Sequence, residues 1–214
     1  MSHTIVLWQA PALVLLLAYL LGSIPFGVIL TRLGGAGDLR QIGSGNIGAT
    51  NVLRTGRKGL AGATLLLDAL KGMAAVWLAE AILPGSGPLG AAASFFGHCY
   101  PVWLRFNGGK GVATLMGIAL ALAWPLGLAY AITWLGLLAI LRISSVAGMA
   151  AAVSAPVTAA VIGRFDLVML LVALALIVIW KHRANIERLM AGTEPRVGSR
   201  SASAAASADA EPSA

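Results

Sequence analysis

The stretch KGVATLMGIALALAWPLGLAYAITWLGLLAIL at 110–141 decides the fold, because it contains no charged residue after its first lysine. A run this long and this apolar suits helices that cross a lipid bilayer better than helices on the surface of a soluble protein. Proline ends a helix, so Trp124-Pro125 predicts a tight hairpin between a span at 110–124 and a span at 125–141. The stretch therefore predicts two neighbouring transmembrane helices.

The rest of the chain has the same character. Of its 214 residues 58% are hydrophobic and 11% are charged, and the mean hydropathy is +0.86. The apolar runs lack the period-2 alternation of barrel strands, which favours helices. We therefore predict an all-α polytopic membrane protein with seven transmembrane helices. The expected spans are 5–31, 59–83, 88–104, 110–124, 125–141, 145–163 and 166–181.

Basic residues predict the orientation. If the N-terminus lies outside and all seven spans cross, every one of the fifteen Lys and Arg residues except Arg164 and Lys71 is at the inner face or in the C-terminal segment. This bias is the positive-inside pattern, and it predicts a cytoplasmic C-terminus. We expect 1–198 to form a single transmembrane domain, and the Ser/Ala-rich 199–214 to be a disordered cytoplasmic tail. Topology and anionic lipids account for the net charge of +7, so no nucleic-acid partner is required.

The loop GSGNIGATNVLR at 43–54 has the composition of a phosphate-binding loop. Its glycines permit positive φ and allow backbone N–H groups to converge on an anion. The guanidinium of Arg54 can bind two phosphate oxygens at once. A short helix that starts near Ala49 would point its N-terminus at the anion. The alternative interpretation is a glycine-rich connector with capping residues. The expected ligand-binding residues of this loop are Gly43, Ser44, Gly45, Asn46, Thr50, Asn51 and Arg54.

Two further polar clusters fall on the same predicted face. The cluster 97–111 contains His98, a candidate for proton transfer, and a Gly-Gly-Lys-Gly run in which Gly108 and Gly109 precede Lys110. The cluster 181–194 is expected to continue the last span as one helix, with His182, Asn185 and Leu189 on one face. Each of these predictions has a structural alternative. His98 could be a hydrogen-bonded structural histidine, Lys110 an ordinary inner-face lysine, and the cluster 181–194 a basic juxtamembrane helix.

Asp68 and Lys71 are charged residues inside the predicted span 59–83. Their spacing of three lets them pair on one helix face. Charges within a membrane span are costly and mark candidate functional sites, although a buried pair that fixes helix packing explains them equally well. The clusters are poor in carboxylates, so no metal or cofactor is expected.

Four ordered motifs resemble the bacterial acyl-phosphate:glycerol-3-phosphate acyltransferase family of PlsY type. They cover nearly the whole chain up to about residue 199 and are specific in combination. The motifs are Gly-Ser-Ile-Pro at 22–25, Gly-Ser-Gly-Asn-x-Gly-Ala-Thr-Asn at 43–51 with Arg54, Gly97-His98 through Gly-Gly-Lys-Gly at 108–111, and His-Arg-x-Asn-Ile-x-Arg-Leu-x-x-Gly-x-Glu at 182–194.

The resemblance implies transfer of a fatty acyl group from acyl phosphate to the sn-1 hydroxyl of glycerol 3-phosphate, the first acylation step of phospholipid synthesis. It implies a multi-pass protein of the bacterial cytoplasmic (inner) membrane whose active site faces the cytoplasm. Membrane lipids and the soluble enzyme that produces acyl phosphate are further expected partners. The expected catalytic residues are Ser44, His98 and Lys110. The expected substrate-binding residues are Gly43, Gly45, Asn46, Thr50, Asn51, Arg54, Gly108, Gly109, His182 and Asn185.

The mechanism that fits these residues is direct transfer in one step. Arg54, Lys110 and Asn185 hold the acceptor phosphate, while loop amides and Ser44 stabilise the departing donor phosphate. Either the donor phosphate or His98 deprotonates the hydroxyl. A covalent role for Ser44 is disfavoured, because no adjacent base is evident. The alternative functions are a phosphate-ester or anion permease and a structural scaffold.

Overall fold

The computed structural model describes residues 2–198, and the tail expected at 199–214 lies outside the described residues. Residues 2–198 form helices and connecting loops, with no strand among them, as the all-α prediction requires. The long helices are α1 (Ser2–Gly22), α4 (Lys58–Ile82), α5 (Gly87–Cys99), α6 (Val112–Leu122), α7 (Trp124–Leu141), α8 (Ser144–Val161) and α9 (Phe165–Lys181). Shorter elements are α2 (Phe26–Leu33), η1 (Leu39–Gln41), α3 (Ala49–Leu53), η2 (Val102–Leu104) and α10 (Arg183–Met190).

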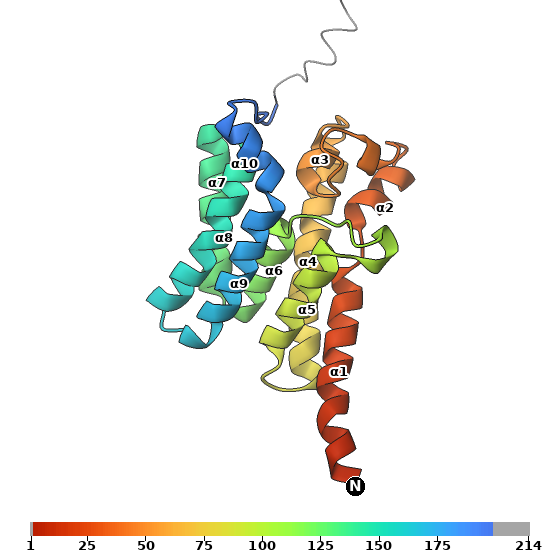
Figure 1. Ribbon diagram of the computed structural model, residues 1–214, viewed down its shortest axis with the longest axis vertical. Coiled ribbons are helices and arrows are strands. Elements are labelled where there is room, and N and C mark those ends of the chain that lie inside the picture. The colour runs from red at the N-terminus through yellow and green to blue at the C-terminus, as the bar shows by residue number, and fades with distance from the viewer. Residues whose placement is uncertain (1, 199–214) are drawn as a thin grey trace, which may run out of the picture.

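The helices form two groups that α6 joins (Figure 1). Helices α1, α4 and α5 pack together, α7, α8 and α9 pack together, and α6 contacts α4 as well as α7 and α8. Helices α2, α3 and α10 gather at the end of the molecule opposite the N-terminus. The first and third polar clusters of the sequence therefore share one end of the bundle.

Glycine brings these helices unusually close. A Cβ atom at Gly117 of α6 would lie 1.9 Å from the Ala69 carbonyl oxygen of α4, and a Cβ atom at Gly22 of α1 would lie 2.0 Å from the Ser94 carbonyl oxygen of α5. Real side chains cannot occupy such positions. Close backbone approach of this kind is the usual packing mode of helices in lipid.

Large apolar side chains point away from the bundle on several helices. Trp77 of α4, Ile132 of α7 and Met169 of α9 are each more than half exposed. Such exposure would promote aggregation in water, but it matches the hydrocarbon of a bilayer. By length and composition, three segments of the described chain suit membrane crossing, namely Trp8–Leu33, Trp124–Leu141 and Ser144–Val161, and the bent pair α9 and α10 would be a fourth.

Several helix boundaries differ from the prediction. The span expected at 5–31 corresponds to the segment Trp8–Leu33, but its helix breaks between α1 and α2, because Pro25 cannot continue the hydrogen-bonding pattern of α1. The span expected at 88–104 ends at Cys99, two residues before Pro101. The turn near Trp124-Pro125 is present, but its extended residue is Ala123 and the proline lies in the first turn of α7. Proline therefore starts the second helix of the pair and does not end the first.

Candidate active site

The first glycine-rich loop folds around the side chain of Asn51. Gly43 and Gly45 adopt positive φ values of 55° and 68°, which glycine tolerates without strain. The Asn51 amide nitrogen donates to the carbonyl oxygens of Leu39 (3.0 Å), Ile42 (2.8 Å) and Asn46 (2.8 Å). Its amide oxygen accepts from the Ser44 backbone N–H at 3.2 Å. Asn51 is buried, so its amide holds the loop in shape from inside.

The outer face of this loop is open to solvent. The exposed residues of the loop are Gly43, Ser44, Gly45, Thr50 and Arg54. Asn46 is half-buried, and its side-chain oxygen accepts a hydrogen bond from the Gly48 N–H (2.9 Å). Helix α3 begins at Ala49, as the sequence predicts, and Arg54 follows its last residue. A Cβ atom at Gly43 would lie 2.6 Å from Arg54 Nη1. The guanidinium therefore lies against the bend of the loop.

The second glycine-rich segment folds back on the C-terminal end of α5. The Gly109 N–H donates to the His98 carbonyl oxygen (3.1 Å), and the Gly108 N–H donates to the Cys99 carbonyl oxygen (3.2 Å). Helix ends leave such carbonyl groups without partners in the helix, so the loop satisfies them. Lys110 directly follows this anchored pair of glycines. Its backbone is therefore fixed before α6 begins.

The third cluster is bent where the sequence predicts one continuous helix. The axes of α9 and α10 differ by 58°, with His182 at the junction. His182 Nδ1 lies 2.8 Å from the Val178 carbonyl oxygen, so the ring packs back on the last turn of α9. The prediction of a straight helix is wrong because the turn at His182 redirects the chain. The bend directs Asn185 of α10 toward the other clusters.

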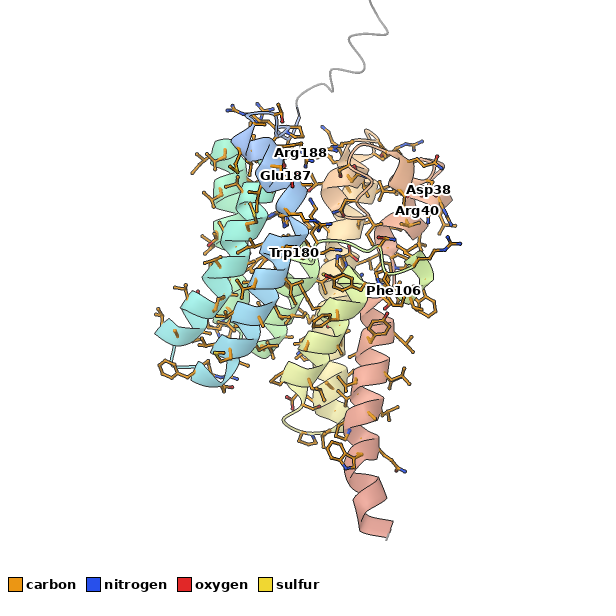
Figure 2. All side chains as sticks on the ribbon, viewed as in Figure 1. Asp38, Arg40, Phe106, Trp180, Glu187 and Arg188 are labelled. Carbon is orange, nitrogen blue, oxygen red and sulfur yellow. The ribbon has the colours of Figure 1, made fainter. Side chains whose placement is uncertain are left out.

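The second and third clusters meet at Lys110 and Asn185, where the Lys110 ammonium donates to the Asn185 amide oxygen. The amide nitrogen of Asn185 donates to Glu194 Oε1 at 2.5 Å. The same carboxylate accepts from the Ser145 hydroxyl of α8 (2.7 Å) and from Arg188 Nε (2.7 Å). Glu194 belongs to the quoted motif without an assigned role, and Ser145 carries no signal in the sequence that would single it out. Figure 2 shows Arg188 at the same end of the molecule as Arg40.

Electrostatics place Arg54 near the same point. Burial, together with the positive charges of Arg188, Arg54 and Lys181, lowers the pKa of Lys110 to about 8 against the opposing effect of Glu194. Burial, followed by the Lys110 charge, lowers the pKa of His182 to about 4. The second and third clusters thus form one cationic site that the charge of Arg54 influences, and His182 is neutral there at physiological pH.

Burial opposes the ionisation of Glu194, but hydrogen bonds from Ser145, Asn185 and Arg188 outweigh this effect and lower its pKa. The carboxylate is therefore charged at neutral pH. It lies on the side of Asn185 opposite Lys110 and compensates part of the positive charge of Lys110 and Arg188. Excess positive charge remains for an anionic ligand.

His98 lies beneath this site rather than in the open. Its side chain is only 3% exposed, and a Cβ atom at Gly109 would lie 2.1 Å from His98 Nε2. Asp68 and Lys71 pair as the spacing predicts, with 2.7 Å between Lys71 Nζ and Asp68 Oδ1. His98 Nδ1 is 3.7 Å from the same carboxylate oxygen. The predicted proton-transfer residue is thus enclosed by protein.

Comparison with known proteins agrees with the resemblance seen in the sequence. Residues 12–192 match the family model described as glycerol-3-phosphate acyltransferase. The chain is 67% identical to the glycerol-3-phosphate acyltransferase of Novosphingobium aromaticivorans over 186 residues, which cover 87% of this chain and 94% of the relative. It is 56% identical to the enzyme of the same name from Erythrobacter litoralis over 190 residues, covering 89% and 96% respectively.

Two solved structures are similar to the whole bundle. Both are crystal structures of PlsY (YgiH), an integral membrane glycerol 3-phosphate acyltransferase. The glycerol 3-phosphate form has a TM-score of 0.83 and 36% sequence identity, covering 89% of this chain and 96% of that chain. The lysophosphatidic acid form has a TM-score of 0.81 and 35% identity, covering 88% and 95%.

Proposed function

This chain belongs to the glycerol-3-phosphate acyltransferase family, and from that membership we propose that it transfers a fatty acyl group from acyl phosphate to the sn-1 hydroxyl of glycerol 3-phosphate. The products are lysophosphatidic acid and inorganic phosphate. The transfer is the first acylation step of phospholipid synthesis. The observation that carries the proposal is the contact between Lys110 and Asn185, which joins two family motifs in one cationic site.

In the proposed reaction, the sn-1 hydroxyl oxygen attacks the acyl carbonyl carbon as the bond from that carbon to the phosphate oxygen breaks. Acyl phosphate is already activated, so positioning and charge stabilisation supply much of the acceleration. Lys110, Asn185 and Arg54 hold the phosphate of glycerol 3-phosphate. The exposed backbone of Gly43, with the Ser44 hydroxyl, stabilises the departing phosphate, whereas the Gly45 N–H donates to the Ile42 carbonyl oxygen (2.9 Å) and shapes the loop. His182, Asn46 and Thr50 complete the proposed substrate contacts. Gly108 and Gly109, whose N–H groups donate to carbonyl oxygens of α5, position Lys110, and Asn51 supports the first loop from inside.

The departing phosphate accepts the hydroxyl proton in this scheme. A general base must come within hydrogen-bond reach of the proton that it removes. The enclosure of His98 between Asp68 and Gly109 leaves little room for an acceptor hydroxyl. Burial therefore supports the donor phosphate over His98 as the base. Ser44 acts as a hydrogen-bond donor, consistent with its nearest side-chain partner, the Asn51 amide oxygen at 3.4 Å.

The proposed topology has seven transmembrane crossings, with the N-terminus outside and the C-terminus cytoplasmic. Residues 1–198 then form one transmembrane acyltransferase domain in the bacterial inner membrane. The location of α2, α3 and α10 at one end of the bundle supports an active site on the cytoplasmic face (Figure 1). Soluble glycerol 3-phosphate reaches that face directly. Acyl phosphate arrives there from the soluble enzyme that produces it, with its acyl chain among membrane lipids.

A purified-component assay tests the function. Enzyme in detergent, given acyl phosphate and radiolabelled glycerol 3-phosphate, should form labelled lysophosphatidic acid and release one phosphate for each product. Glycerol without phosphate serves as the control acceptor and should react poorly. Absence of product from folded protein would reject the proposal. Mass spectrometry after rapid quenching should find no acyl group on Ser44, and an acylated serine during turnover would reject direct transfer.

A phosphate-ester permease is the alternative, because a permease also needs anion-binding loops. Transporters commonly place their site near mid-membrane between repeats. Figure 2 instead shows Arg188, which bonds to Glu194 in the cationic site, toward one end of the bundle. Uptake of labelled glycerol 3-phosphate into proteoliposomes without acyl phosphate would favour the permease.

A further inference from the structure

Asp68 and Lys71 form a buried ion pair within α4. Lys71 Nζ lies 2.7 Å from Asp68 Oδ1, and the two side chains are 4% and 1% exposed for Asp68 and Lys71 respectively. Charged side chains inside a membrane-spanning helix are costly, and they are usually found where they bind another polar group or serve a site. The proposed acyl transfer uses neither residue. Their further contacts indicate what the pair does.

Lys71 extends the pair toward the first phosphate loop, 43–54. Its ammonium donates to the Ile24 carbonyl oxygen at 2.7 Å, in the break between α1 and α2. Gly27, in the first turn of α2, packs so closely on the loop that a Cβ atom there would lie 2.0 Å from the Ile47 carbonyl oxygen. Lys71 therefore fixes the start of the helix on which the loop rests.

Asp68 lies next to His98, and the His98 ring in turn contacts the second phosphate loop, 108–111. The distance from Asp68 Oδ1 to His98 Nδ1 is 3.7 Å, and among the described residues this nitrogen has no hydrogen-bond partner. The opposite edge of the imidazole abuts Gly109, whose N–H donates to the His98 carbonyl oxygen (3.1 Å). The ring thus lies between Asp68 and the backbone that carries Lys110.

We propose that Asp68 and Lys71 are positioning residues that set the separation of the two phosphate loops and thereby the affinity for the phosphate of glycerol 3-phosphate. The ammonium holds the α2 side through its hydrogen bond to Ile24, the carboxylate faces the His98 ring without a hydrogen bond to it, and the ion pair joins both sides within one turn of α4. This inference rests on the proposed function, because it concerns the same phosphate site. A pair that only fixed helix packing would change the amount of folded enzyme and leave its affinity unaltered.

The test compares Asp68→Asn and Lys71→Met with wild type as purified enzyme in detergent. The readouts are KM for glycerol 3-phosphate, kcat per folded enzyme, and the rise in Tm that glycerol 3-phosphate produces without acyl phosphate. A shift of about 1 Å in a binding group can cost up to about 100-fold. We expect KM to rise about 10- to 100-fold, with a smaller change in kcat and a reduced Tm shift. Lys71→Arg keeps the cation and should recover part of the affinity.

Leu171→Ala is the matched stability control, since Leu171 is fully buried in α9 among apolar side chains. It should lower Tm while leaving KM for glycerol 3-phosphate unchanged. If a single variant leaves an unpaired buried charge and does not fold, the double variant Asp68→Asn with Lys71→Met replaces it, because both charges are then removed. A raised KM in the double variant supports the proposal.

Folded variants that keep the wild-type KM and the wild-type Tm shift would overturn the positioning role. That result differs from failure of the proposed function. In the latter case, wild-type enzyme itself would form no lysophosphatidic acid. The binding readout separates the two cases further, because the Tm shift produced by glycerol 3-phosphate requires no turnover.

Discussion

The Lys110 ammonium donates to the amide oxygen of Asn185, a residue 75 positions further along the chain. Asn185 is itself fixed, because its amide nitrogen donates to Glu194 (2.5 Å) and its side chain is buried. The oxygen and the nitrogen of a primary amide point in different directions, so an acceptor at the nitrogen favours the orientation that presents the oxygen to the cation. Glu194 therefore determines which end of Asn185 faces Lys110.

Removing the ammonium should remove most of the activity. We expect Lys110→Ala to lower kcat/KM for glycerol 3-phosphate about 100- to 1,000-fold, the usual loss for one stabilising donor in an enclosed site. Asn185→Asp should also lose activity, because the new carboxylate would neutralise Lys110 and face Glu194. Lys58→Ala, an exposed lysine at the start of α4, is the control. Wild-type activity in Lys110→Ala would exclude Lys110 from the site.

The lowered pKa of Lys110 predicts a pH dependence. The pKa is about 8, so the positive charge is complete well below pH 8 and is lost as the pH rises through that value. We expect kcat/KM for glycerol 3-phosphate to decline over the same interval. Lys110→Arg should move the decline to higher pH, because a guanidinium stays protonated. A decline at the same pH in both enzymes would mean that another group controls it. Acyl phosphate hydrolysis without enzyme is subtracted at each pH.

The Asn51 side chain predicts a loss of loop structure on substitution. Its amide nitrogen donates to three carbonyl groups, and aspartate has no N–H to replace it. Asn51→Asp should therefore increase hydrogen exchange across 43–54 and lower activity about as strongly as Asn51→Ala. Asn107→Ala is the control, because Asn107 is exposed and its side-chain amide donates to the Arg105 carbonyl oxygen outside this loop. Unchanged exchange in Asn51→Asp would contradict the role of Asn51 in holding the loop.

The sequence predicts the glycine loops better than it predicts their supports. Positive φ at Gly43 and Gly45 and the start of α3 at Ala49 follow from local composition, which is visible along the chain. Asn51 is also visible, but its neighbours suggest a ligand donor, whereas its bonds run inward. Only the folded loop shows which carbonyl groups the amide faces. Local sequence thus predicts the conformation of the loop but not the direction of a polar side chain.

Contacts between residues far apart in the chain are the second feature of the site that the sequence does not predict. Asp68 and Lys71 are recognisable as a helical pair, since they are three positions apart in the sequence. Ser145 lies in an apolar helix, and nothing in its neighbourhood predicts a bond to Glu194, which is 49 positions away. The 58° bend at His182 likewise accompanies the packing of the His182 ring on α9. The helical periodicity of the sequence cannot predict such a contact. Tertiary contacts therefore determine how the three motifs meet.

Glu194 should contribute to stability more than any exposed acid of the same segment. Its carboxylate accepts from Ser145, Asn185 and Arg188, so removal leaves two buried polar groups without their acceptor. Each such group costs about 1–3 kcal/mol, and each kcal/mol lowers Tm by about 2–4 °C in a protein of this size. We expect Glu194→Ala to lower Tm measurably and to disorder Asn185, whereas Glu187→Ala, at an exposed position of α10, should not.

The lowered pKa of Glu194 adds a pH test to the same pair of variants. A depressed carboxyl pKa means that the stabilisation is present above the ordinary pKa of a glutamate and is lost as the pH falls through the lowered value. The difference in Tm between wild type and Glu194→Ala should therefore be largest near neutral pH and should shrink under acid conditions. A difference that is independent of pH would mean that Glu194 stabilises the protein through packing, and not through its charge.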